Sequence, residues 1–101
     1  MTKEELLKNE VFKKAPSNAM MVYENFDGES YIIGSPVCRF KNVVRFTNGV
    51  GITKEELLKD KFFRMANMNA KLELSQYNRI FMLFLCKVIY DDGFLIIKEF
   101  V

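Results

Sequence analysis

Three pairs of adjacent carboxylates are the residues in this 101-residue chain whose type would suit acid–base chemistry. They are Glu4-Glu5, Glu55-Glu56 and Asp91-Asp92. A glycosidase-like reaction needs two carboxylates that face each other across a cleft. Each pair here has a local explanation instead, because the glutamates fall at predicted helix starts and the aspartates at a predicted turn. We therefore expect no acid–base catalysis from these pairs.

The two cysteines, Cys38 and Cys86, are the candidate thiol nucleophiles. The chain has no histidine, so neither thiol has the usual general base, and a Cys/His cluster for zinc is missing. Gly49-Val50-Gly51 precedes a helix start, but a glutamate in that first turn would repel phosphate. We expect both cysteines to be small buried core residues, and we expect no cofactor and no metal.

Arg39, Lys41 and Arg45 form a candidate basic face, since they are interleaved with Phe40 and Phe46. Basic and aromatic side chains on neighbouring strands can follow a single nucleic-acid strand and stack its bases. The overall charge argues against this function, because 15 basic and 13 acidic residues leave a net charge of only +2. A solvated surface is the favoured interpretation, and nucleic acid is an unlikely partner.

The elements that must position these residues are related by an internal repeat. Thr-Lys-Glu-Glu-Leu-Leu-Lys occurs at residues 2–8 and again at residues 53–59, an offset of 51. In each occurrence a threonine precedes a glutamate by three residues, which predicts a helix that begins with a capping box. Phe12 and Phe63 also match at this offset. We interpret the chain as an internal duplication, in which Pro16 ends the first helical region.

Strand patterns follow each predicted helix. In the first repeat they cover residues 19–24, 31–40 with a bulge or kink at Gly34-Ser35-Pro36, and 43–47. In the second they cover residues 71–75, an unbroken run over 80–90, and 94–97. Asp27-Gly28 and Asp92-Gly93 are hairpin signals, and with gaps Cys86 falls opposite Cys38.

The predicted fold class is therefore α+β, with tandem duplicated αβββ units and antiparallel strands. The first repeat covers residues 1–48, a glycine-containing linker covers 49–52, and the second repeat covers 53–101. A single core shared by the two repeats is the alternative to two separate cores.

The segment Phe81-Met82-Leu83-Phe84-Leu85 is apolar at every position. A half-exposed strand would alternate, so the segment is expected to be covered on both faces. Burial by the helices and the other repeat is the favoured reading, and cover by another chain is the alternative. The candidate partner interface under that alternative comprises Phe81, Leu83, Leu85, Leu95 and Ile97.

The run Glu4-Glu5-Leu6-Leu7, followed by Phe12, Pro16 and Ala19 to Tyr23, resembles a pattern in small phage-borne and bacterial proteins. The tandem form, rich in Lys, Asn and Phe, is similar to small virion accessory proteins of tailed phages, including crAss-like phages. The resemblance implies a capsid-decorating (auxiliary capsid) protein located in the virion. It brings no catalytic residues with it.

The expected function is thus that of a non-enzymatic structural or interaction protein whose partner is a capsid or other virion protein. An intracellular adaptor or inhibitor in the cytoplasm is the alternative, and a weak single-stranded nucleic-acid binder is the third hypothesis. No membrane association is expected, because the longest apolar run, residues 80–90, is interrupted by Lys87 and is too short to span a bilayer.

Overall fold

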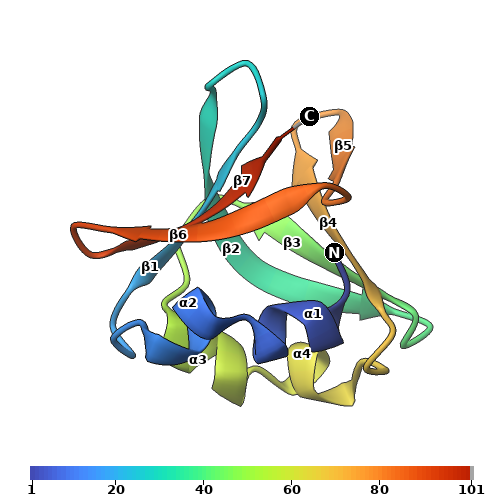
Figure 1. The fold of residues 1–101 in the computed structure, drawn as a ribbon. Coiled ribbons are helices and arrows are strands. Elements are labelled where there is room, and N and C mark those ends of the chain that lie inside the picture. Colours follow the sequence, from blue (N-terminus) through green and yellow to red (C-terminus); the bar gives the residue numbers. More distant parts are fainter. Residues whose placement is uncertain (101) are drawn as a thin grey trace.

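The computed structural model describes residues 1–100, which form four short helices and one sheet of seven strands (Figure 1). This arrangement confirms the α+β class. The helices are α1 (Lys3–Lys8), α2 (Glu10–Lys14), α3 (Lys54–Lys59) and α4 (Lys61–Met65). The strands are β1 (Met20–Glu24), β2 (Ser30–Arg39), β3 (Val43–Asn48), β4 (Lys71–Gln76), β5 (Arg79–Met82), β6 (Cys86–Asp91) and β7 (Phe94–Glu99).

Each predicted helical region is split into two helices by one capping residue. Asn9 has an extended backbone, and its side-chain oxygen accepts a hydrogen bond from the Phe12 N–H, so α2 begins where α1 ends. Asp60 does the same between α3 and α4, where it accepts from the Phe63 N–H. Both predicted capping boxes are present. Asn9 and Asp60 thus bond the backbone N–H groups of the following turn with their side chains, which ends the first helix and starts the second.

The sheet is mixed, so the expectation of antiparallel strands is wrong for two of its pairings. Its strand order is β5-β4-β3-β2-β1-β7-β6, in which β3 pairs with β4 and β1 pairs with β7 in parallel. The α3–α4 connection between β3 and β4 is a helical crossover, which brings the next strand back in the same direction. The three strands of the first part of the chain therefore form the centre of the sheet, with two strands of the second part on each side.

Contacts on the two sides of the Gly49–Gly51 linker match at the offset of 51 residues. We call residues 1–48 the N-terminal half and residues 53–100 the C-terminal half. Met20 lies opposite Phe94 in the β1–β7 pair, and Lys71 lies opposite Val43 in the β4–β3 pair. The isolated bridges Thr2 to Lys71 and Met20 to Thr53 are related in the same way. Each half thus pairs its first strand with the last strand of the other half.

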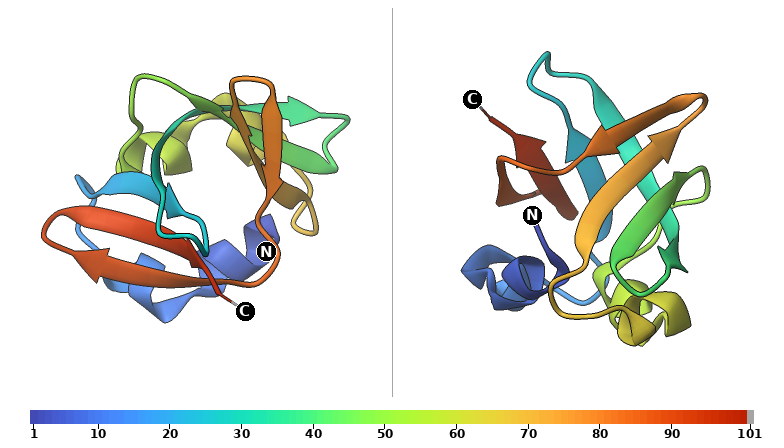
Figure 2. Two further views of the ribbon diagram at one scale, coloured as in Figure 1. Left: turned by 90° about the horizontal axis from the view of Figure 1, so that it is seen from above. Right: turned by 90° about the vertical axis from the view of Figure 1, so that its right-hand side faces the viewer.

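The helices close one end of the curved sheet, and the core lies between them and its inner face (Figures 1 and 2). Viewed from above, the strands curl around the centre of the molecule (Figure 2). Large side chains from both halves meet there in one hydrophobic cluster, including Leu6, Phe12, Tyr23, Phe46, Leu57 and Phe63, all at most 2% exposed.

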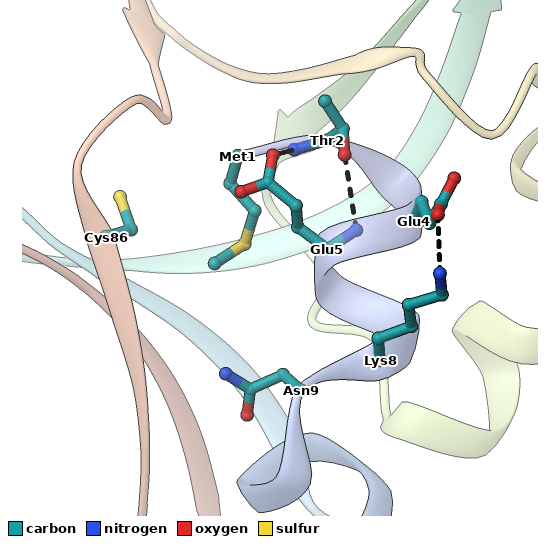
Figure 3. Close-up of a pocket in the computed structure, with 7 residues that line it drawn as sticks. All are labelled: Met1, Thr2, Glu4, Glu5, Lys8, Asn9 and Cys86. Carbon is teal, nitrogen blue, oxygen red and sulfur yellow. Dashed lines mark hydrogen bonds and ion pairs between the residues drawn. The ribbon is translucent and has the colours of Figure 1, made fainter.

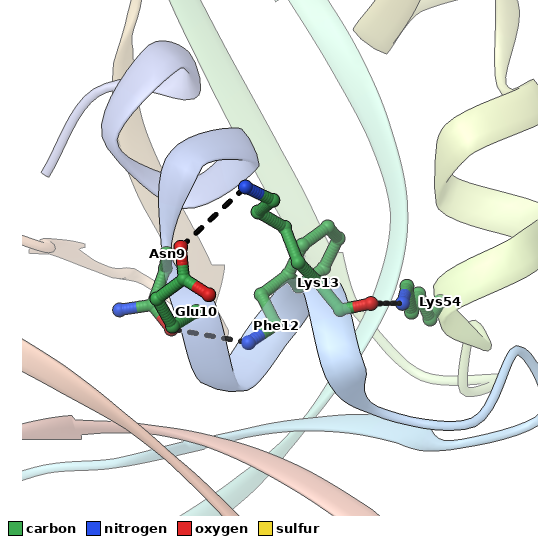
Figure 4. A network of polar contacts seen from close by, with 5 residues as sticks. All are labelled: Asn9, Glu10, Phe12, Lys13 and Lys54. Atoms are coloured by element: carbon green, nitrogen blue, oxygen red, sulfur yellow. Dashed lines mark hydrogen bonds and ion pairs between the residues drawn. The ribbon is translucent and has the colours of Figure 1, made fainter.

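Two buried lysines tie each helix pair to the other. The Lys54 ammonium donates to the carbonyls of Lys13 (3.0 Å) and Ala15 (2.9 Å) at the end of α2, as Figure 4 shows for Lys13. The Lys3 ammonium donates to the carbonyls of Arg64 (3.3 Å) and Ala66 (3.0 Å) at the end of α4. A cation at a helix C-terminus satisfies free carbonyls and suits the helix dipole.

The prediction for the second strand is confirmed in the N-terminal half and wrong in the C-terminal half. β2 is one strand with the expected irregularity, a register shift between Ile33 and Pro36, whereas the predicted unbroken strand over residues 80–90 stops after Met82 and resumes at Cys86. Gly34 permits the continuation, because a Cβ there would lie 2.9 Å from the Thr47 carbonyl oxygen. Leu83 turns into the core, while Phe84 and Leu85 are 64% and 60% exposed, so the segment is not covered on both faces.

The strand register also corrects the predicted alignment of the cysteines. Cys38 lies opposite Val44 on β3, and the residue opposite the equivalent Leu95 on β7 is Tyr90. Tyr90, not Cys86, therefore matches Cys38. Both cysteines are free and half-buried, and they pack against the core cluster instead of lying within it.

Candidate protein-interaction surface

The outer face of the β2-β1-β7-β6 side of the sheet carries an uninterrupted row of aliphatic side chains. Ile32 lies opposite Val22, Val22 opposite Ile96, and Ile96 opposite Ile89. Directly opposed residues of neighbouring strands project from the same face, and the alternate residues Met21, Tyr23, Leu95 and Ile97 fill the core. We call these four residues the aliphatic row. Ile32 is 50% exposed and the other three are half-buried.

The equivalent row on the β5-β4-β3-β2 side has a charged centre. Its residues, taken by strand register, are Met82, Glu73, Arg45 and Val37. Arg45 and Glu73 occupy the places of Ile96 and Val22, and their side chains form an ion pair of 3.0 Å. The two sides of the sheet share a backbone arrangement but present opposite chemistry, which singles out the aliphatic row.

Met20 and Phe94 extend the aliphatic row toward the helices. They lie opposite each other on β1 and β7, one row away from Val22 and Ile96, and Phe94 is 46% exposed. The aliphatic row together with Met20 and Phe94 is called the apolar face below. A groove of about 320 Å³ runs along it, lined by Val22, Ser30, Tyr31, Ile32, Phe94 and Ile96.

Gly51 fixes the border of the apolar face. A Cβ at this position would overlap the Met20 methyl carbon and lie 3.0 Å from an Ile32 methyl carbon. The linker backbone therefore lies directly against both side chains, and a larger residue at position 51 would displace the Met20 methyl group. This contact positions Met20 and Ile32 without covering the centre of the face.

A charged row borders the apolar face on the side away from the helices. Glu24 lies opposite Lys98, with a distance of 3.5 Å between the carboxylate and the ammonium. Ser30 lies beyond Glu24 on β2, and Lys87 lies beyond Lys98 on β6. An apolar centre with a polar border is the usual composition of a protein–protein contact surface.

The candidate interface residues that sequence reasoning selected are scattered by the structure. Leu83, Leu95 and Ile97 are at most 1% exposed, so as core residues they are unable to contact a partner, which corrects that expectation. Phe81 is half-buried and packs on the Tyr23 ring at 5.6 Å between centroids. Only Leu85 of the set is exposed, at 60%.

The structure leaves two of the three residues of the candidate basic face exposed. Arg45 is taken up by its ion pair with Glu73, where both side chains are mostly buried. Arg39 and Lys41 are exposed at the end of β2 and in the turn that follows it. Two separate surface cations resemble a solvated edge more than a track for a nucleic-acid backbone.

A wider pocket of about 580 Å³ lies beside α1, but its polar groups are occupied (Figure 3). Glu4 pairs with Lys8 at 2.6 Å, and Glu5 accepts from the Thr2 N–H at 3.0 Å. Cys86 also lines this pocket, and burial, aided by the Glu99 carboxylate, raises the pKa of its thiol to about 11. Such a thiol is protonated at neutral pH and is a poor nucleophile.

Residues 1–100 contain no cluster of three or more metal-ligating side chains. None of the helices in this range has the length and hydrophobicity that crossing a membrane requires.

Sequence reasoning missed the apolar face although its signal was present. Met20-Met21-Val22-Tyr23 and Phe94-Leu95-Ile96-Ile97 are apolar at consecutive positions, which means that both faces of each strand are apolar. The longer apolar run at residues 81–85 led instead to the prediction of an interface on the second repeat. The pairing of β1 with β7 brings the two overlooked runs side by side.

Comparisons of this chain with protein-family models, with curated proteins and with solved structures give no match.

Proposed function

We propose that this chain is a non-enzymatic protein-interaction subunit that binds its partner through the apolar face. The observation that carries the proposal is the aliphatic row, where the equivalent positions of the other side hold an ion pair. An apolar patch of this extent on a sheet face is costly to leave in water and is typical of a binding surface.

The shape of the surface supports a protein partner over a small ligand. The groove along the apolar face is lined by residues of three neighbouring strands, mostly apolar and without a charged group among them. Small-molecule sites instead bury most of their ligand in a concave pocket with converging polar groups. A flat partner surface such as another sheet or a helix fits the row better.

We also propose that the two halves arose by internal duplication. The shared offset of 51 in the capping boxes, the lysine contacts and the parallel strand pairs supports this origin. On this view both sides of the sheet began with the same outer row. The aliphatic row and the Arg45–Glu73 pair would be their later specialisation.

The setting proposed for this function is a phage virion, with the chain as a capsid-decorating protein. The support is the sequence resemblance to small virion accessory proteins together with the outward apolar face. Intact particles should then contain the chain in a fixed copy number, measured by quantitative mass spectrometry. Purified particles without it would contradict the virion setting and leave the interaction surface itself to the next test.

The test of the surface uses a photo-reactive phenylalanine analogue at Phe94 in the cells that produce the protein. We expect a crosslink to one protein. Ile89→Lys should abolish it, because a lysine in the aliphatic row must lose water on binding. Val37→Lys is the matched control, since Val37 occupies the equivalent position on the other side, and it should leave the crosslink intact. No crosslink, or one that survives Ile89→Lys, would overturn the proposal.

A further inference from the structure

The outer face that carries the aliphatic row is self-complementary in both its apolar and its charged residues. Consider a two-fold axis that lies just outside the outer face, parallel to the strands and midway between β1 and β7. A rotation about it brings the outer faces of two molecules together, with β1 of each molecule over β7 of the other. It places Val22 over Ile96 of a second molecule and Ile32 over Ile89. The axis thus aligns every side chain of the aliphatic row with another aliphatic side chain, and the approach is closest at Val22 and Ile96 because the outer face of the curled sheet is convex.

The same axis matches the charged row with itself. Glu24 of one molecule faces Lys98 of the other, and Lys98 faces Glu24, because the two residues lie opposite each other on β1 and β7. The present 3.5 Å contact within one chain would then belong to a cluster of two carboxylates and two ammonium groups. Alternating charges of this kind fix the orientation of two partners more than they add affinity.

The third row is also compatible with this symmetry. Met20 meets Phe94 of the second molecule and Phe94 meets Met20, so the apolar face closes on itself without an unmatched charge at its centre. The strands of the two sheets would run nearly parallel to one another, which is the aligned packing of sheet faces, offset by about 30° through their twist.

From this symmetry we infer that the partner of the apolar face is a second copy of the same chain. This inference rests on the proposed function, because it names the partner of that same surface. The apolar face together with the charged row is at most four strands wide and three rows long, or no more than roughly 400 Å² on each copy from the strand spacings. A contact of that size is small for a permanent dimer, so the dimer is reversible.

The test is sedimentation of the purified chain from about 10 µM to about 1 mM, the range in which a small interface is half-occupied. The wild type should shift with concentration from the monomer mass of 11.9 kDa toward twice that value. Ile89→Lys should remain monomeric, whereas Val37→Lys should associate like the wild type.

Charge reversal tests the orientation. Glu24→Lys and Lys98→Glu should each weaken self-association by about tenfold or more, because each facing pair becomes a pair of like charges. An equal mixture of the two variants should associate at least as well as the wild type, since every facing pair is then of opposite charge. The double variant restores the pairs within one chain and should also associate.

A wild type that stays monomeric throughout would overturn the inference, as would a dimer that ignores Ile89→Lys or a mixture no better than its components. The crosslink from Phe94 separates this failure from that of the proposed function. If the chain is monomeric but Phe94 crosslinks to a different protein, the second-copy inference fails and the interaction surface stands. If Phe94 crosslinks to no protein, both fail.

Discussion

At the scale of single residues, the structure explains why charged side chains lie at the ends of the core. Lys3 and Lys54 are only 7% and 9% exposed, yet each ammonium has two carbonyl partners and lies 5.2 Å from the centre of a phenylalanine ring. Burial of a charge is tolerated when its hydrogen bonds are satisfied. The lysines of the repeated motif are therefore structural.

Replacing Lys54 by methionine tests this role. The substitution keeps the apolar contact with Phe12 but leaves the carbonyls of Lys13 and Ala15 without their donor. We expect a loss of about 2 kcal/mol in the free energy of unfolding, measured by urea denaturation. Lys59→Met is the control, because Lys59 is largely exposed and its pair with Glu55 is worth little. Equal effects of the two substitutions would contradict the assignment.

The thiol of Cys86 gives a prediction about pH. Burial raises its pKa from 9.0 to about 11, so the folded state favours the neutral thiol. This contribution to stability is complete below pH 9.0 and is lost as the pH rises toward about 11, because only the unfolded chain ionises in between. In a Cys38→Ser background, the rate of alkylation by iodoacetamide should rise with a midpoint near the raised value. A midpoint at or below the ordinary value would contradict the burial of this thiol.

At the scale of elements, local signals in the sequence predicted how each helix begins but not how long it is. The repeated Thr and Glu were enough to locate both capping boxes. The early ends of α1 and α3 were not predicted. At Asn9 and Asp60 the first helix stops and a second one begins, because Phe12 and Phe63 must enter the core. Tertiary packing decides such cases.

The capping boxes themselves can be tested. In Thr53→Ala the Glu56 N–H loses the hydroxyl that accepts its hydrogen bond at 3.1 Å. We expect a loss of about 1 kcal/mol in unfolding free energy, and Thr53→Ser should retain most of the stability because it keeps the acceptor. Calorimetric melting of the three proteins measures this. An alanine variant as stable as the wild type would show that the cap contributes nothing.

The broken strand of the C-terminal half shows what a pattern of hydrophobic residues leaves undetermined. Eleven residues rich in apolar side chains predicted one long strand, but Leu83 must enter the core while its neighbours Phe84 and Leu85 turn outward. In the N-terminal half, the glycine and proline predicted a bulge or kink within one strand, which the register shift in β2 confirms. In the C-terminal half the outcome depends on contacts with residues distant in sequence, which periodicity does not reveal.

At the scale of the whole molecule, the pairing of β1 with β7 and of β3 with β4 determines which outward residues become neighbours. The sequence indicated an α+β fold and a repeat, but it did not reveal these parallel pairs. Without the β1–β7 pair, the aliphatic row is two separate pairs on two hairpins, Ile32 with Val22 and Ile96 with Ile89. The candidate site was therefore beyond prediction from one sequence, although the apolar character of its strands was visible.

The role of an apolar row can be tested by building a second one on the β5-β4-β3-β2 side of the sheet. Arg45→Ile with Glu73→Val would give the β5-β4-β3-β2 side an apolar row that matches the aliphatic row in position. Because a buried ion pair is often replaced by apolar residues at little cost, we expect stability within about 1 kcal/mol of the wild type. A chain with two apolar faces should form assemblies larger than a dimer, seen by light scattering. An unchanged association state would contradict the role assigned to such a row.

The most direct measurement compares crosslinking yields when the same photo-reactive residue replaces Ile89 in one preparation and Val37 in another. The two positions are equivalent in the sheet, and both lie at the outer end of a row of four opposed residues. We predict a crosslink to protein at position 89 with a yield about tenfold or more above that at position 37. Equal yields, or a higher yield at position 37, would contradict the claim that the apolar face is the interaction surface.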